Sequence, residues 1–222
     1  RQALALLAQV RTISVTSSGP LPAFDQAFLL REMQIFIDWF VLQHLKLTLT
    51  EQEHAMLQRH FLWLADSALR QPQAGMHRDY HSRNLMVQPD GELAVIDFQD
   101  IVIGPVSYDA VSLLKDCYKR WPEPFVVQQR DAFFRQLQQS AVFDATWSVE
   151  RFAKSFDFMG LQRHIKVCGI FARLYHRDHK AGYLADLPRV VGYVVDIAKQ
   201  YPELSAFSHW FEQVVLPRFA EV

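Results

Sequence analysis

Residues 77–84 read His77-Arg78-Asp79-Tyr80-His81-Ser82-Arg83-Asn84. The stretch has the form His, any residue, Asp, with an Asn five residues after the Asp, and this Asn is the only one in the sequence. A second aspartate, Asp97, follows between Ile96 and Phe98. The polar pattern predicts a loop whose two ends carry a carboxylate and an amide.

The residues between Asn84 and Asp97 predict a short hairpin. Two apolar runs, residues 85–88 and 93–96, are separated by the turn residues Pro, Asp and Gly at positions 89–91. Such a pattern is typical of two strands joined by a tight turn. The returning strand would bring Asp97 back to the loop that carries Asp79.

These residue types suit phosphoryl transfer. The reaction needs an acceptor for the hydroxyl proton of the substrate and oxygen ligands for magnesium. We interpret Asp79 as the base, and Asn84 and Asp97 as ligands of Mg²⁺, with ATP as the phosphate donor. The alternative is that His, Asp and Asn, which are common in loops, have fallen into this order by coincidence.

The same residues resemble the Brenner motif and the metal-binding aspartate of the aminoglycoside phosphotransferase and choline kinase superfamily, which shares the protein-kinase fold. The resemblance implies a mainly α fold with a small β-hairpin region. It implies one helical C-terminal lobe over residues 1–222, with a catalytic loop at 77–84 and a metal-binding loop at 96–100.

An N-terminal lobe that clamps the nucleotide is expected to be absent from this chain. The glycines of the chain are scattered singly, and the lysine that would bind the phosphates is missing. As given, the chain should bind nucleotide poorly and show little turnover. The missing lobe of the same protein is therefore an expected partner.

Two further residues take supporting roles by this resemblance. His77 would pack beneath the metal-binding aspartate, and Asp109, five residues after Gly104, would brace the catalytic loop through hydrogen bonds. An ordinary first-turn aspartate that is favoured by the helix dipole is the alternative for Asp109.

Longer strings within residues 24–122 are similar to a bacterial subgroup that phosphorylates N-acetylmuramate and N-acetylglucosamine at the anomeric hydroxyl during cell-wall recycling. The resemblance implies transfer of the ATP γ-phosphate to the C1 hydroxyl of such a sugar. Other acceptors stay open, namely an aminoglycoside, choline, homoserine or another small alcohol. A non-catalytic binding lobe is the alternative from a different class.

Contacts to the substrate are less specified by the sequence. Six polar side chains could face the cleft, although a solvated helix face or a loop-bracing pair explains each of them equally well or better. They are Arg31, Glu32, His81, Arg83, Asp100 and Asp116.

Helical periodicity covers most of the remaining chain. A capping box, Thr50 with Glu53, opens a helix that should stop before Pro72. Residues 17–22 are expected to form a surface loop. The other helices are expected after Asp25, at residues 108–118 behind Ser107, at 123–139, from Ser148 to near His179, and at 187–199.

Composition sets the remaining expectations. The 23 basic and 24 acidic residues nearly cancel, and no run of like charges favours nucleic acid as a partner. The two cysteines do not form a disulfide framework. With no expected membrane segment or signal peptide, a cytoplasmic location is predicted.

Overall fold

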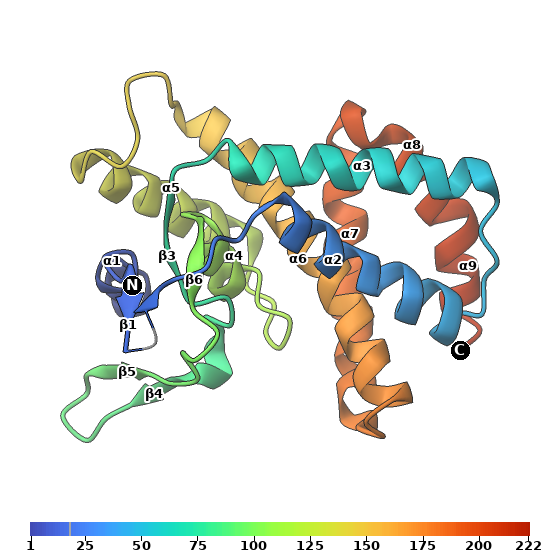
Figure 1. Ribbon diagram of the computed structural model, residues 1–222, viewed down its shortest axis with the longest axis horizontal. Coiled ribbons are helices and arrows are strands. Elements are labelled where there is room, and N and C mark those ends of the chain that lie inside the picture. Colours follow the sequence, from blue (N-terminus) through green and yellow to red (C-terminus); the bar gives the residue numbers. More distant parts are fainter. Residues whose placement is uncertain (18) are drawn as a thin grey trace. The chain divides into compact units, whose positions relative to one another are not determined.

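The computed structural model describes residues 1–17 and 19–222, and contacts divide the chain into two compact units. The first unit comprises Arg1–Asp25 and Ser67–Gly160, and the second Gln26–Asp66 and Leu161–Val222. Both are mainly helical, with small two-stranded sheets in the first, which confirms the predicted fold class (Figure 1). The assignment of residues 1–222 to a single lobe stays a prediction.

Helices α3 (Glu51–Leu69) and α6 (Val149–His176) contribute residues to both units. Among the residues that the structure describes, no helix is both long and apolar enough to cross a membrane.

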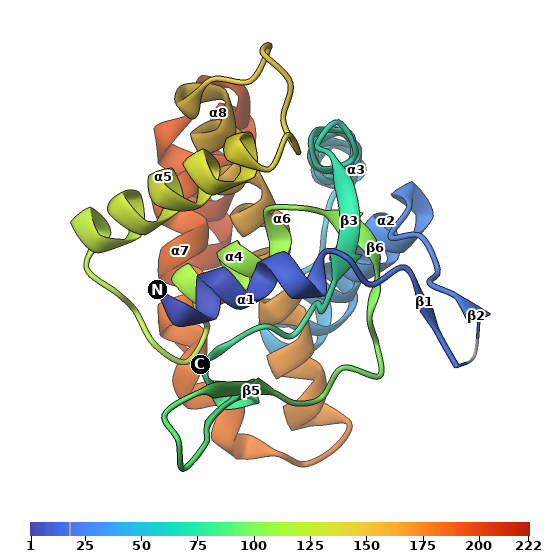
Figure 2. The ribbon, with the colours of Figure 1, turned by 90° about the vertical axis from the view of Figure 1, so that its left-hand side faces the viewer.

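The first unit carries the strands. Its other elements in chain order are α1 (Gln2–Val10), β1 (Val15–Thr16), β2 (Gly19–Pro20), β3 (Gln73–Met76), the 3₁₀ turn η2 (Ser82–Asn84), β4 (Leu85–Val87), β5 (Leu93–Val95), β6 (Val102–Pro105), α4 (Tyr108–Leu114) and α5 (Glu123–Gln139). The β4–β5 hairpin is the predicted one, with Leu85 opposite Val95. Strand β3 pairs with β6 in antiparallel register, and α1 packs against α4 (Figure 2).

Two sequence-based expectations for this unit need correction, and one strand pair was not expected. Helix α4 ends at Leu114 rather than at residue 118, because Lys115 leaves the helical conformation. The β3–β6 pair was not predicted, since its strands are short and contain Gly and Pro. Within the expected loop at residues 17–22, Gly19–Pro20 pairs with Val15–Thr16, and Ser18 lies outside the described residues.

An aromatic cluster forms part of the core of the first unit. The Phe134 ring stacks on Phe152 with centroids 5.2 Å apart, and Phe143 lies 4.5 Å from Trp147. These side chains come from α5, α6 and the segment between them. Burial of such large rings is a main source of stability in a core.

The second unit is helical throughout its described elements. Besides its parts of α3 and α6, these are α2 (Gln26–Ile35), the π-helix η1 (Phe36–His44), η3 (Ala181–Asp186), α7 (Leu187–Gln200), η4 (Pro202–Leu204), α8 (Ser205–Trp210), the π-helix η5 (Phe211–Val215) and α9 (Leu216–Phe219). The predicted capping box is confirmed, since the Thr50 amide donates to the Glu53 carboxylate and the Glu53 amide donates to the Thr50 hydroxyl. The predicted long helix after Asp25 continues past Ile35 with π rather than α geometry.

A close backbone approach and a buried ion pair connect α2 and η1 to α6 in this unit. A side chain at Gly169 would meet the Ile35 carbonyl at 2.5 Å, so only a glycine lets the two helices come this close. Nearby on α2, the buried Glu32 carboxylate forms an ion pair with Lys166, whose Nζ lies 2.7 Å away. Position 169 therefore requires glycine for close packing of the helices rather than for turn geometry.

Candidate active site

All the residues predicted for catalysis and metal binding lie in the first unit. Residues 77–84 run from the end of β3 to the end of η2, and Asp97 follows β5. The hairpin of β4 and β5 returns the chain from Asn84 to Ile96, whose amide donates to the Asn84 carbonyl at 3.1 Å. Local pairing thus brings the two polar segments together.

The carboxylate of Asp109 holds the start of the catalytic loop. One oxygen accepts the backbone amide hydrogen of His77 at 2.7 Å, and the other accepts that of Arg78 at 3.0 Å. Asp109 lies in the first turn of α4 and is buried. Charge-assisted contacts of this kind are stronger than hydrogen bonds between neutral groups.

The side chain of Asn84 connects the backbone at Asp79 to the carboxylate of Asp97. Its amide nitrogen donates to the Asp79 backbone carbonyl at 3.0 Å and lies 3.4 Å from Asp97 Oδ2. The second Asp97 oxygen accepts from the Gln99 side chain at 2.6 Å. Asn84 is buried, whereas Asp79 is half-buried and Asp97 is exposed.

His77 lies beneath the segment that carries Asp97. Its Nε2 donates to the Ile96 carbonyl at 3.0 Å, in the tautomer that this partner requires. Burial lowers the pKa of His77, and this outweighs the opposing effects of Ile96, Asp79 and Asp97. A neutral ring that bonds to backbone is suited to support rather than to proton transfer.

Two residues of the site have left-handed backbone conformations that non-glycine residues rarely adopt. Arg78 has a φ of +74° and Asp97 a φ of +67°. Each such conformation costs about 1–3 kcal/mol and persists only where contacts with its surroundings hold it in place. At Arg78, Asp109 accepts the amide, and the guanidinium donates to the Asp100 carbonyl at 3.4 Å.

The donor set at Asn84 and Asp97 fits magnesium. The amide nitrogen of Asn84 is engaged, so its oxygen is the atom left to bind a metal, and Asp97 supplies carboxylate oxygen. Mg²⁺ prefers oxygen ligands and is usually held by one or two protein groups together with substrate phosphates. Across residues 1–17 and 19–222, no cluster of three or more His, Cys, Asp or Glu side chains forms a separate metal site.

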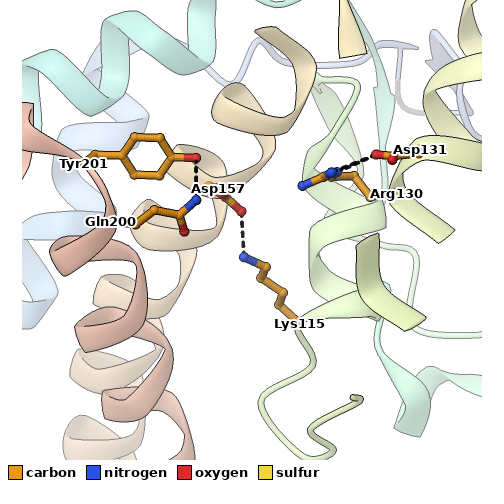
Figure 3. Close-up of polar contacts among 6 residues, drawn as sticks. All are labelled: Lys115, Arg130, Asp131, Asp157, Gln200 and Tyr201. Carbon is orange, nitrogen blue, oxygen red and sulfur yellow. Dashed lines mark hydrogen bonds and ion pairs between the residues drawn. The ribbon is translucent and has the colours of Figure 1, made fainter. Parts of the chain in front are cut away.

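A buried ion pair follows α4. Lys115 Nζ lies 2.7 Å from Asp157 Oδ1, with side chains only 5% and 7% exposed (Figure 3). Removal of one partner would leave an uncompensated buried charge, which usually costs several kcal/mol. The pair therefore holds the end of α4 against α6 within the first unit.

The predicted substrate contacts are distributed between the two units. His81 and Arg83 both pack on the Tyr118 ring, and the Asp100 side chain is exposed. In the second unit, Arg31 stacks on Phe28 and Glu32 pairs with Lys166. Their roles toward a substrate stay predictions.

Sequence reasoning considered Asp116 only as a side chain that could face the cleft, and it assigned no role to the Lys115–Asp157 pair. Asp116 is fully buried, and Asp157 Oδ1 forms an ion pair with Lys115. Both aspartates lie in otherwise helical surroundings, where an exposed face is the usual expectation. Their burial depends on partners 34 and 42 residues away, which no local pattern indicates.

The sequence of this chain is similar to those of known proteins. The sequence model described as the phosphotransferase enzyme family matches residues 1–152. The N-acetylmuramate/N-acetylglucosamine kinase of Pseudomonas putida is 44% identical over 84% of this chain and 55% of that protein. The protein of the same name from Pseudomonas aeruginosa is 40% identical over 98% of this chain and 63% of its own length.

Solved structures agree on the fold. An ethanolamine kinase of Plasmodium vivax matches with a TM-score of 0.60 at 12% identity, covering 92% of this chain and 61% of the other. An ADP-bound aminoglycoside phosphotransferase matches with a TM-score of 0.51 at 15% identity, covering 88% and 64%. The chain therefore spans between about half and two thirds of the length of the proteins it matches.

Proposed function

Because the chain belongs to the phosphotransferase enzyme family, we propose that the complete natural protein is an ATP-dependent kinase for the C1 hydroxyl of N-acetylmuramate or N-acetylglucosamine. The observation that carries the chemistry is the Asn84 amide, which contacts both the Asp79 carbonyl and the Asp97 carboxylate. The names of relatives at 40–44% identity support the sugar substrate.

In the proposed reaction, Asp79 accepts the proton of the C1 hydroxyl. The hydroxyl oxygen forms a bond to the γ-phosphorus while the bond from that phosphorus to the leaving oxygen of ADP breaks. A half-buried carboxylate on a braced loop can be oriented toward the hydroxyl without reorganising during the reaction. His77 and Asp109 keep this loop in position and take no proton.

Asn84 and Asp97 are the residues that would hold magnesium. When bound, the ion would supply positive charge that offsets the charge developing on the phosphate oxygens. The exposed position of Asp97 leaves its carboxylate accessible to a nucleotide, and Gln99 orients one of its oxygens. Because ATP is the donor, the reaction is assigned to the cytoplasm.

The additional length of the relatives would supply a nucleotide-clamping lobe. Apolar side chains near the site are unusually exposed, including Val87 at 72% and Phe98 at 65%. Phe98 also lines a cavity of about 330 Å³ between α1, β5 and His77, and most of the cavity lining is apolar. Such a surface is typical of a region that another part of a protein covers.

Phosphorus NMR tests the proposed reaction. The complete natural protein is incubated with magnesium, ATP and either sugar, and a sugar 1-phosphate signal is expected. Asp79→Asn should abolish the signal. Asp90→Asn is the matched control, because Asp90 lies at the turn of the same hairpin, where its Oδ1 accepts the Glu92 amide hydrogen.

A different acceptor would give another result. If neither sugar yields a phosphate ester but ADP forms with another small alcohol, the sugar assignment is wrong and the phosphotransferase assignment stands. If no alcohol in a broad panel supports ADP formation, the lobe is a binding module.

A further inference from the structure

The turn that follows α4 lies against the second half of the catalytic loop. Asp116 is fully buried, and its Oδ2 accepts the backbone amide hydrogen of Ser82 at 2.9 Å. Its Oδ1 accepts the amide hydrogen of Tyr118 at 2.8 Å. One carboxylate therefore fixes its own turn and the loop at the same time.

The Ser82 amide occupies a special place in that loop. It opens the 3₁₀ turn η2, which ends at the predicted metal ligand Asn84. The preceding residue, His81, is extended at φ −121° and ψ 172° and provides no side-chain cap. The first amides of a helical turn have no partner within it and need an acceptor from elsewhere. Asp116 supplies that acceptor from a distant part of the chain.

Side chains on both sides of Ser82 pack on the same ring. The His81 ring meets the Tyr118 ring edge to face with centroids 5.1 Å apart. The Arg83 guanidinium carbon lies 3.5 Å from the Tyr118 ring centre, a close cation–π contact. Residues 81–83 are thus all held by residues 116–118.

We propose that Asp116 is a positioning residue for phosphoryl transfer, which sets the turn Ser82–Asn84 so that the Asn84 side chain meets Asp97, with Tyr118 fixing the flanking His81 and Arg83. The inference rests on the proposed function. It divides the support of the loop in two, because Asp109 holds residues 77 and 78 and Asp116 holds the turn that carries the metal ligand.

The replacement Asp116→Asn separates this role from general stability. An amide keeps one acceptor but turns an NH₂ group toward one of the two backbone N–H groups, so one contact is lost. A displaced turn would carry Asn84 away from the metal. We expect the magnesium concentration for half-maximal activity to rise about tenfold and kcat to fall at least tenfold, with a smaller change in the KM for sugar.

A second variant removes the same hydrogen bond from its other side. Ser82→Pro deletes the amide hydrogen at the first position of the turn, where proline fits a helical conformation. The extended conformation of His81 is the one that a residue before proline prefers. Ser82→Pro should therefore reproduce the magnesium effect without changing Asp116.

Two control variants of the complete protein accompany these measurements. Asp144→Asn makes the same chemical change in an exposed turn outside the site, where Asp144 Oδ1 accepts the Thr146 amide hydrogen at 2.9 Å and the oxygen of an asparagine can take its place. Leu137→Ala removes buried apolar volume from α5 and destabilises the same unit. Both should keep the magnesium dependence of the natural protein.

Hydrogen exchange gives a readout that does not depend on turnover. Peptides that cover residues 81–84 should exchange about tenfold faster in Asp116→Asn, whereas those that cover Gln73–Met76 should keep their rate. This result would support the inference even if the natural protein phosphorylated no sugar. Unchanged exchange at residues 81–84 would overturn it, as would an unchanged magnesium dependence in an active, folded variant. An activity loss no larger than that of Leu137→Ala, explained by melting temperature alone, would overturn it too.

Discussion

Asp109 accepts the backbone amide hydrogen of His77 at 2.7 Å, across 32 residues of sequence. Its second oxygen accepts the amide of Arg78, which has a positive φ. The contact therefore offsets the strain of an unusual backbone conformation at the entrance to the catalytic loop.

Replacement of Asp109 by Asn should weaken both fold and activity. The new amide group presents a donor where an acceptor is required, so one buried amide loses its partner. We expect the free energy of unfolding to fall by about 1–3 kcal/mol in a urea titration, together with a lower kcat. The exposed Asp144→Asn is the matched control. Equal stability of Asp109→Asn and the natural protein would contradict the bracing role.

Asp79→Asn should separate chemistry from nucleotide binding in the complete protein. A positioned base contributes about 10²–10⁴ to the rate, so kcat should fall by several orders of magnitude. Affinity for magnesium-ATP, measured by calorimetric titration, should change little. Asp97→Asn should instead weaken nucleotide binding. A large loss of ATP affinity in Asp79→Asn would reassign Asp79 to metal binding.

A histidine pair in the second unit should make stability depend on pH. His44 Nδ1 lies 3.2 Å from His176 Nε2, and the Tyr175 ring is also close to His44. Burial, and secondarily the charge of His176, lowers the pKa of His44 from 6.5. Between that lowered pKa and 6.5, the unfolded chain binds more protons than the folded chain. The stability that the neutral His44 contributes is therefore fully present above pH 6.5 and is lost as the pH falls through the lowered pKa.

Melting temperatures at about pH 8 and pH 5.5 check this dependence. The decrease on acidification should be smaller in His44→Gln than in the natural sequence. His54→Gln, which changes an exposed histidine, serves as the control. An equal decrease in all three proteins would show that the His44 environment does not matter.

Two glycines of α6 should respond in opposite ways to alanine. A Cβ at Gly169 would lie 2.5 Å from backbone atoms of Ile35 and Phe36, which cannot move aside easily. We expect Gly169→Ala to destabilise by about 1–3 kcal/mol or more. At Gly160 the nearest atoms are 3.6 Å away, so alanine should be neutral or stabilising by up to about 1 kcal/mol. Urea unfolding of both variants measures the difference, and similar values would contradict the close approach.

Local patterns predicted the helices well where the deciding contacts are also local. Thr50 and Glu53 form their capping box within one turn, and α5 has the predicted bounds. The end of α4 was predicted too late because Lys115 and Asp116 turn toward Asp157 and Ser82, which are remote in sequence. The β3–β6 pair depends on similarly distant partners.

Prediction of the site residues was likewise limited to those that a local sequence pattern connects. Asp79, Asn84 and Asp97 could be grouped because the hairpin between them has a local signature, and the structure brings Asn84 into contact with the other two. Arg31 and Glu32 were chosen for polarity alone, and they lie in the other unit. Polarity does not distinguish a ligand contact from an ion pair such as that of Glu32 with Lys166.

The short sequence separations within the site have a consequence for the order of folding. The contacts of Asn84, Asp109 and Asp116 with the catalytic loop span at most 34 residues. Closing such loops carries a modest entropic cost, which grows by only about 0.6 kcal/mol for each doubling of loop length. Structures rich in near-neighbour contacts form rapidly. During synthesis, the loops that carry Asp79 and Asp97 can therefore meet their braces once Tyr118 has emerged from the ribosome, before α7, α8 and α9 have been made.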